Sequence, residues 1–202
     1  MHRSVLAVGA HPDDVEFGVG GTLARHAAAG DLVRIMVLTG GEAGTEVTEV
    51  RRREAEEAAG LIGAEVTIGK LADTRIAEKD AIDLVEVLLG GDRPGIAYIH
   101  TASDTHQDHR AAAYACRVAL RAVPRVYAYQ APSATEEFQP ARYTGLRSRH
   151  LAQKLEMVER HKSQGSRWYA SSGYIRSAAA YWGARSGGGY AEPLEVLRDR
   201  VG

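Results

Sequence analysis

Two short clusters of histidine and aspartate could carry chemistry in this sequence of 202 residues. The first cluster is His11-Pro12-Asp13-Asp14, which directly follows the apolar run at residues 4–10. The second cluster contains His106, Asp108 and His109. Adjacent carboxylates repel each other unless a cation lies beside them, and imidazole with carboxylate is an ordinary ligand set for zinc. The two clusters therefore indicate a metal site of the kind that activates water for hydrolysis.

A simpler interpretation exists for the first cluster, because aspartate is a favoured capping residue and Asp13 or Asp14 could merely begin a helix. His106 and His109 are three residues apart, so they lie on one face of a helix start. Their spacing, together with the first cluster, favours a metal site over isolated polar residues. Catalytic zinc takes three protein ligands and keeps one open position. One carboxylate and one histidine are then left for proton transfer and for polarising a substrate.

Apolar runs alternate with helical patterns along the chain. We expect strands at residues 4–10, 32–38, 65–69, 95–100 and 125–130, and helices at 20–29, 47–62, 78–89, 107–122 and 148–162. This alternation predicts an α/β fold that is Rossmann-like and doubly wound, with a mostly parallel sheet of five or more strands and helices on both faces. In the commoner strand orders the first and fourth strands are neighbours, and ligands bind at their carboxyl ends. The two clusters should therefore meet at one edge of the sheet.

The length fits a single domain spanning residues 1–202, with irregular segments at 131–147 and 165–202 that could serve a substrate or an interface. A net charge of −1 gives no indication of nucleic acid binding. Cys116 is the single cysteine, so no internal disulfide is expected. Because no signal segment or membrane-spanning run is present, we expect a cytoplasmic protein without membrane insertion. The aromatic residues near the C-terminus and the small residues at 178–180 predict a homo-oligomer.

The order of these motifs resembles that of the PIG-L/LmbE-like zinc de-N-acetylases. The similarity covers about residues 4–165 and rests on His11-Pro12-Asp13-Asp14-x-Glu16, Thr39-Gly40-Gly41-Glu42 and His106-x-Asp108-His109-Arg110, with further matches at Arg51-x-x-Glu54, Tyr129-Gln130-Ala131-Pro132-Ser133 and His161-Lys162-Ser163-Gln164. One departure is Gln130, where many relatives have glutamate. The resemblance implies an enzyme that removes an N-acetyl group from an N-acetylglucosamine-type sugar or glycoconjugate, such as N-acetylglucosaminyl-phosphatidylinositol or a mycothiol precursor.

The resemblance also implies roles for the clustered residues. The implied cofactor is Zn²⁺, or another divalent transition metal such as Fe²⁺, and its ligands are His11, Asp14 and His109. Asp13 would be the general base that takes a proton from the attacking water. Protonated His106 would stabilise the oxyanion, with its ring held by Asp108.

Other implied assignments are less specific. Arg51 and Asp73 occupy positions at which the family contacts the sugar or its aglycone, although Arg51 could instead pair with Glu54 along a helix.

A zinc amidase that cleaves a larger amide, such as a thiol-sugar conjugate, is an alternative function with the same site. A nucleotide-binding α/β protein is another, but the glycines at 18–21 only approach the dinucleotide motif. A non-enzymatic protein with a vestigial site is a third, but no ligand or base is missing.

Overall fold

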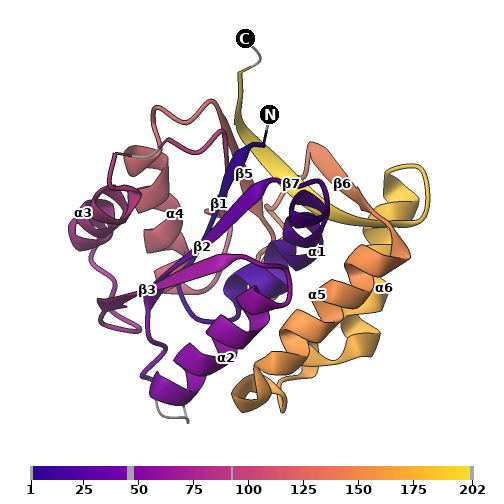
Figure 1. The fold of residues 1–202 in the computed structure, drawn as a ribbon, viewed down its shortest axis with the longest axis horizontal. Helices are drawn as coiled ribbons and strands as arrows, with labels where there is room; N and C mark the ends of the chain where they lie inside the picture. The colour runs from indigo at the N-terminus through magenta and orange to yellow at the C-terminus, as the bar shows by residue number, and fades with distance from the viewer. Residues whose placement is uncertain (1, 45–47, 92, 201–202) are drawn as a thin grey trace.

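The computed structural model describes residues 2–44, 48–91 and 93–200. Within this part of the chain, seven strands form one sheet in the order β3-β2-β1-β4-β5-β7-β6, with helices on both faces (Figure 1). The strands are β1 (Ser4–Gly9), β2 (Leu32–Thr39), β3 (Glu65–Leu71), β4 (Ile96–His100), β5 (Arg125–Tyr129), β6 (Arg142–Leu146) and β7 (Tyr190–Asp199). β1 to β5 pair in parallel, whereas β7 is antiparallel to both β5 and β6. The predicted mostly parallel α/β sheet is confirmed.

Two layers of helices enclose the sheet. The helices are α1 (Asp14–Ala28), α2 (Thr48–Gly60), α3 (Glu78–Leu89), α4 (Gln107–Ala119), α5 (Ser148–Arg160) and α6 (Ser172–Arg185). Two short 3₁₀ helices, η1 (Lys162–Gln164) and η2 (Trp168–Ala170), lie between α5 and α6. Val5 and Ala7 of β1 pack into the core under α1, whereas Leu6 and Val8 pack into the core under α3 and α4. Because β1 is covered on both faces, its sequence is continuously apolar.

The helix that we expected at residues 20–29 begins earlier, at Asp14, and continues through a kink at Val19. Gly18, Gly20 and Gly21 therefore lie inside α1 and not in a loop. A Cβ added at Gly18 would stand 2.2 Å from the ring of Tyr129. These glycines let neighbouring elements approach the helix. They do not form the phosphate-binding loop that a dinucleotide motif would require. The expected start of the next helix, residue 47, lies outside the described residues.

The expectation of irregular segments at 131–147 and 165–202 is wrong in part. The first segment contains β6, and the second contains α6 and β7, which extend the main sheet. The strand pattern of β7 is interrupted by Pro193, and its formation depends on pairing with β5 and β6, which lie far from it in sequence. Local periodicity could not show this pairing, since β propensity depends strongly on context.

Packing around Tyr129 ties α1 to the strands that carry the two clusters. Its buried hydroxyl donates a hydrogen bond to the Val8 carbonyl oxygen at 2.9 Å, and its ring centroid lies 4.7 Å from that of His100. Gly18→Ala would force a methyl group into this ring. We expect this variant to lose about 1–3 kcal/mol of unfolding free energy, the usual cost of overpacking a core.

Urea unfolding of the Gly18→Ala variant tests this expectation. Gly173→Ala is the matched control, because Gly173 also lies in a helix, α6, but has nothing within 4 Å of an added Cβ. The control should be neutral or slightly stabilising, since alanine favours helix more than glycine does. Equal unfolding midpoints for the two variants would contradict the role given to Gly18.

Part of the region from which we predicted an oligomer packs inside the chain. Ala179 belongs to a buried cluster with Leu151 and Ile175, and Trp182 Nε1 donates to Gln130 Oε1 at 3.2 Å. The homo-oligomer therefore stays a prediction, which light scattering at micromolar concentration would check. The described helices include none with both the length and the apolar character needed to cross a membrane.

Candidate active site

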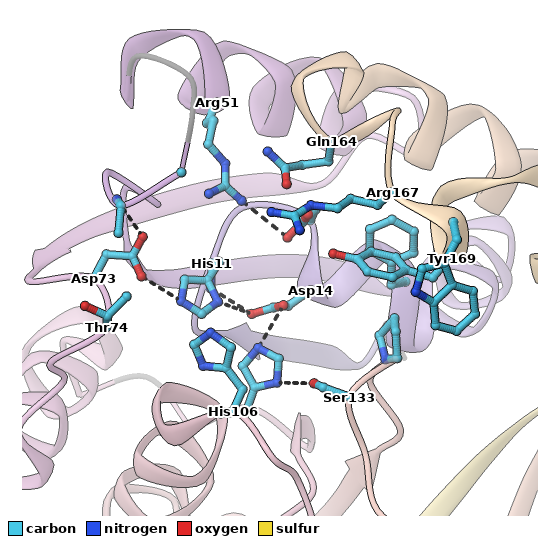
Figure 2. A pocket seen from close by; sticks show the side chains of 17 residues that line it. His11, Asp14, Arg51, Asp73, Thr74, His106, Ser133, Gln164, Arg167 and Tyr169 are labelled. Carbon is cyan, nitrogen blue, oxygen red and sulfur yellow. Dashed lines mark hydrogen bonds and ion pairs between the residues drawn. The ribbon is translucent and has the colours of Figure 1, made fainter.

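The two histidine clusters meet at the carboxyl edge of the sheet, as expected from the strand order. β1 and β4 are hydrogen-bonded neighbours, with Val5 opposite Ile96, and the loops after them border a cavity of about 500 Å³ (Figure 2). The residues named from the sequence that line this cavity are His11, Asp13, Asp14, Arg51, Asp73, His106 and His109. Asp108 lies behind this lining, in the first turn of α4.

Asp14 lies between two histidines in a way that suits a metal ion. Its Oδ2 is 3.3 Å from His11 Nδ1, and its Oδ1 is 3.2 Å from His109 Nε2. These residues are buried, and their ligand atoms all lie within 4.8 Å of one another. Tetrahedral ligands about 2.1 Å from zinc stand about 3.4 Å apart. The donor atoms are therefore close enough together to bind one metal ion.

Overlapping groups of acids and histidines could also bind a metal, namely His11 with His106 and Asp108, and His100 with Asp104 and His109. Each of these groups includes at least one residue that does not line the cavity. A catalytic metal needs a coordination position open to water and substrate. Among the groups formed by the described residues, His11, Asp14 and His109 meet this requirement best, because all of them face the cavity.

Negative charge dominates the surroundings of these ligands. Burial alone would lower the pKa of His11, but the carboxylates of Asp14, Asp108 and Asp73 raise it to about 12. Burial likewise opposes protonation of His109, whose pKa is raised to about 9 by Asp14 and Asp104. This excess of carboxylates favours positive charge nearby, which protonated histidines carry when no metal is bound. A divalent cation would supply that charge by displacing the imidazole protons.

Asp13 and Asp14 are adjacent, yet their side chains lie in different places. Asp13 has a φ of 118° and a ψ of −27°, a region that residues other than glycine rarely occupy. This backbone leaves the Asp13 carboxylate 3.6 Å from Arg51 Nη2, whereas Asp14 faces the histidines. Burial and the neighbouring Asp14 raise the pKa of Asp13 to about 7. The unusual backbone separates two carboxylates that the sequence could not distinguish.

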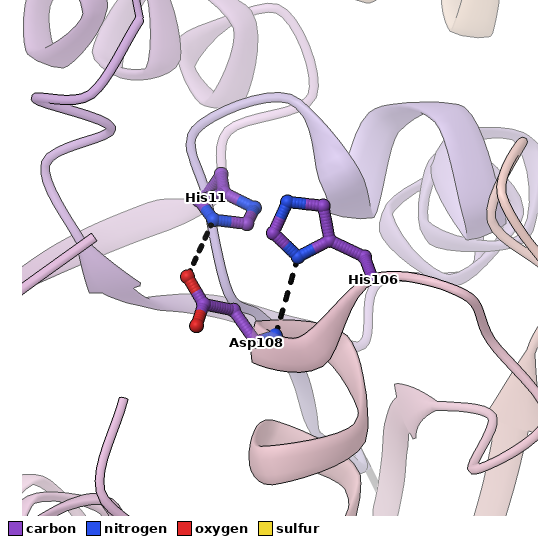
Figure 3. Close-up of side chains that lie close together, drawn as sticks. All are labelled: His11, His106 and Asp108. Atoms are coloured by element: carbon purple, nitrogen blue, oxygen red, sulfur yellow. Dashed lines mark hydrogen bonds and ion pairs between the residues drawn. The ribbon is translucent and has the colours of Figure 1, made fainter. Parts of the chain in front are cut away.

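The expected pairing of the Asp108 carboxylate with the His106 ring is wrong. Asp108 Oδ2 lies 3.2 Å from His11 Nε2 (Figure 3). The same oxygen accepts a hydrogen bond from the Thr74 backbone N–H. The first turn of α4 directs this side chain toward the loop at residues 73–76. It is the Asp108 backbone N–H that contacts His106, by donating to Nδ1 at 3.2 Å.

This contact determines which nitrogen of His106 carries a proton. Because the Asp108 backbone N–H is a donor, His106 Nδ1 accepts and Nε2 keeps the hydrogen of a neutral ring. Burial and the charges of His109 and His11 lower the pKa of His106. A neutral ring that donates from Nε2 is therefore favoured over the protonated ring that we expected.

Arg51 does not pair with Glu54 along α2. Arg51 Nη2 donates to the Pro12 carbonyl oxygen at 2.8 Å, and Nη1 donates to that of Gly41 at 3.0 Å. Glu54 instead accepts hydrogen bonds from the backbone N–H and the hydroxyl of Ser163. Arg51 thus braces the loop that carries Asp13.

Asp73 directly contacts one of the candidate metal ligands. Its Oδ1 is 3.0 Å from His11 Nε2, and its Oδ2 accepts from the Ala43 backbone N–H at 2.9 Å. These hydrogen bonds lower the pKa of Asp73 to about 2. Asp73 lines the cavity and therefore can orient His11 and face a ligand at the same time.

Gly41 makes room for Arg51. Gly41 has a φ of 70°, and an added Cβ would lie 2.1 Å from Arg51 Nη1. Gly41→Ala should displace the Arg51 guanidinium. It should lower kcat/KM for the reaction at this site by about tenfold or more, since a small displacement of an active-site group can lower the rate strongly. Steady-state kinetics and thermal unfolding would measure the two effects.

Gly63→Ala provides the matched control for Gly41→Ala. Gly63 has a similar φ of 66° but nothing within 4 Å of an added Cβ. Both variants should lose stability from backbone strain, about 1 kcal/mol or more. Only Gly41→Ala should also lose activity, and equal activity losses would show that the Arg51 contact is unimportant.

The structure adds His100 and Asp104 to the residues around the site. His100 has its Nε2 3.0 Å from Asp14 Oδ2, and its ring stacks on that of His109 with centroids 4.1 Å apart. Asp104 Oδ2 lies 3.0 Å from His109 Nδ1. Such partners orient metal ligands. His100 ends β4 at the edge where ligands bind, and this position was the signal that could have identified it.

His161 supports the site from behind. The residue is 2% exposed, and its Nε2 lies 3.5 Å from Oε1 of Glu16, which is in the first turn of α1. Ser163, two residues later, binds Glu54 of α2. The segment at residues 161–164 therefore joins α1 to α2 and places buried Gln164 in the cavity wall. This match to the family motif has a structural explanation.

Comparisons with known proteins show which family this chain is similar to. Residues 6–120 match the family model described as PIG-L: GlcNAc-PI de-N-acetylase. The chain is 34% identical over 169 residues to the uncharacterized deacetylase YaiS of Escherichia coli K12, covering 80% of this chain and 91% of the relative. It is 27% identical to diacetylchitobiose deacetylase of Thermococcus kodakarensis, covering 96% and 83% of the two chains. Both clusters lie within the matched residues.

The same fold also occurs in a protein with another activity. The structure of GalB, the 4-carboxy-2-hydroxymuconate hydratase of Pseudomonas putida KT2440, matches with a TM-score of 0.84. The sequences are 22% identical, and the match covers 99% of this chain and 98% of GalB. This likeness shows the fold alone, so the reaction has to be inferred from the site residues and from the closer sequence relatives.

Proposed function

Because the chain belongs to the PIG-L (GlcNAc-PI de-N-acetylase) family of deacetylases, we propose that it is a zinc-dependent hydrolase that removes the N-acetyl group from an N-acetylglucosamine-type sugar or glycoconjugate. The observation that carries this proposal is the cavity-facing group of His11, Asp14 and His109, with Asp13 and His106 beside it. These residues provide a metal site, a base and a hydrogen-bond donor around one space. Amide hydrolysis by a metal-activated water uses all of these.

His11, Asp14 and His109 would hold the metal, and His100, Asp104 and Asp108 would orient those ligands from outside the cavity. When bound, zinc would lower the pKa of water to near 7 and polarise the acetyl carbonyl. We propose Zn²⁺ because nitrogen and carboxylate ligands at tetrahedral spacing suit it. Fe²⁺ is the competing metal, since imidazole and carboxylate ligands also bind iron.

Asp13 would act as the general base. Its carboxylate faces the cavity but is not between the histidines, so it is available to take a proton from the attacking water. The water oxygen forms a new bond to the acetyl carbon, and the C–N bond then breaks. The proton held by Asp13 passes to the departing sugar nitrogen, leaving acetate and a free amine. Burial raises the pKa of Asp13 above its ordinary value, which favours a carboxyl group that both takes and returns a proton.

His106 would stabilise the developing oxyanion through Nε2–H. The backbone N–H of Asp108 holds Nδ1, so the ring is oriented before substrate binds. The ring stacks on His109 with centroids 4.6 Å apart, which places it beside a proposed ligand. A preoriented donor at the position where charge develops contributes strongly to catalysis of acyl transfer.

An acetylated sugar is the substrate class that relatives support, since diacetylchitobiose deacetylase is a relative over most of its length. Arg51, Asp73 and Gln164 line the cavity and offer hydrogen bonds suited to sugar hydroxyl groups. The alternative substrate, a larger amide such as a thiol-sugar conjugate, uses the same metal, base and donor. Only the fit of the substrate in the cavity separates these two proposals.

The test is release of acetate by the zinc-loaded protein from N-acetylglucosamine, N,N′-diacetylchitobiose and larger amide conjugates of glucosamine. We expect acetate and primary amine in equal amounts from the acetylated sugars. Turnover of the larger amides alone would replace deacetylation by the amidase alternative. Absence of turnover on all amides would overturn the proposal, and hydration of 4-carboxy-2-hydroxymuconate would then indicate the reaction of GalB. A parallel loading with Fe²⁺ identifies the metal that supports the higher rate.

A further inference from the structure

The cavity extends beyond the proposed catalytic residues. Its outer wall comes from the chain between α5 and α6, where Arg167, Trp168 and Tyr169 line it (Figure 2). With about 500 Å³, the cavity is within the usual range for a ligand of drug-like size, which exceeds one acetylated sugar ring. A substrate with a second group attached to the sugar would reach this wall.

Trp168 contacts two tyrosine rings although much of the residue is exposed to solvent. The side chain is 66% exposed. Its indole ring meets the ring of Tyr174 nearly at right angles with centroids 4.9 Å apart, and that of Tyr169 at 5.7 Å. Tyr169 is itself packed against Phe17 at 5.1 Å. A large, oriented aromatic surface exposed at the rim of a cavity is typical of a binding site.

Arg167 differs from the other charged residues of the cavity. Arg51 and Asp73 have hydrogen-bond partners, and the carboxylates of Asp13 and Asp14 face Arg51 and the histidines. Among the described residues, the Arg167 guanidinium has neither a hydrogen-bond nor an ion-pair partner, and Figure 2 shows it extending over the cavity. A guanidinium in that state is available to pair with an anionic group of a ligand.

We propose that Arg167 and Trp168 form a subsite for the aglycone of the substrate, the group attached to the sugar. This proposal rests on the proposed deacetylase function and names the substrate class: a glycoside whose aglycone contains a flat ring and a negative charge. The ring stacks on the indole of Trp168, and the anionic group pairs with Arg167. The sugar then places its acetamide at Asp13 and His106.

The test compares kcat/KM for N-acetylglucosamine with values for its 4-nitrophenyl and 4-carboxyphenyl glycosides, using both anomers. Acetate release by the zinc-loaded protein is the readout. The wild-type protein should prefer the carboxyphenyl glycoside. Trp168→Ala should lower kcat/KM for both aryl glycosides by about tenfold, the upper range for an aromatic contact. The same variant should change the value for free N-acetylglucosamine by less than about twofold, because that substrate has no ring to stack.

Arg167→Gln should act on the charge and not on the ring. It should reduce the preference for the carboxyphenyl over the nitrophenyl glycoside by about threefold to fivefold, which is the size of an exposed ion pair. Raising the salt concentration should reduce the same preference in the wild-type protein, because exposed pairs are screened.

Tyr181 and Arg185 of α6 provide a matched control pair. Tyr181 is 55% exposed and lies 5.9 Å under the Arg185 guanidinium, and neither residue lines the cavity. Tyr181→Ala and Arg185→Gln should leave all these ratios unchanged. Equal ratios in wild-type, Trp168→Ala and Arg167→Gln proteins would overturn the subsite while acetate release still supports deacetylation. Absence of acetate from every substrate would instead overturn the proposed function itself.

Discussion

Asp13→Asn is expected to keep the zinc content near one ion per chain while lowering kcat for deacetylation by about 10²–10⁴-fold. Asparagine preserves the shape of the side chain and its distance from Arg51 Nη2, which is 3.6 Å for the carboxylate. It cannot take a proton from water, however, so the proposed base is lost. Since Asp13 does not lie between His11 and His109, the proposed ligand set should be intact.

Elemental analysis and acetate release, measured on the same preparation, check this result. Asp31→Asn is a suitable control, because Asp31 is also a buried aspartate beside an arginine, with Oδ2 3.0 Å from Arg3 Nη2, but lies outside the cavity. The control should retain both zinc and activity. A zinc-free Asp13→Asn protein would show that Asp13 is a ligand, and an active, zinc-loaded one would show that another group is the base.

Asp14→Asn is expected to show the opposite pattern, with metal lost first and activity lost as a consequence. The Asp14 carboxylate contacts His11, His100 and His109 at 3.0–3.3 Å. An amide removes the negative charge that a divalent cation requires. We expect zinc affinity to fall by at least about 100-fold, more than the loss usual for residues that only orient ligands. His11→Ala and His109→Ala should behave in the same way.

Competition with a chromogenic chelator would measure these affinities. Saturating zinc should partly restore the rate of Asp14→Asn but should leave the rate of Asp13→Asn unchanged, because a missing base cannot be replaced by more metal. If Asp14→Asn bound zinc as tightly as the wild-type protein while Asp13→Asn did not, the two roles would be reversed. Restoration of both variants by zinc would show that both aspartates act mainly through the metal.

Much of the fold could be predicted from the sequence because its signals are local. The apolar run before His11 predicts a buried strand that ends at a polar loop, and the helix expected at residues 78–89 matches α3 (Glu78–Leu89). The doubly wound strand order then brings His11 close to His109, with ring centroids 5.4 Å apart. Periodicity and strand alternation depend on neighbouring residues, so the chain itself carries this information.

The contacts made by each side chain required the tertiary structure. Adjacent aspartates look alike in sequence, and only the positive φ of Asp13 separates their carboxylates. The Asp108 carboxylate contacts His11 and not the ring of His106, because the first turn of α4 faces the loop at residues 73–76. Trp168 is exposed while Trp182 is packed, although both belong to the same aromatic-rich region. Composition and spacing determine which groups meet at the sheet edge, but side-chain direction follows from backbone angles and from packing between distant segments, which no local pattern encodes.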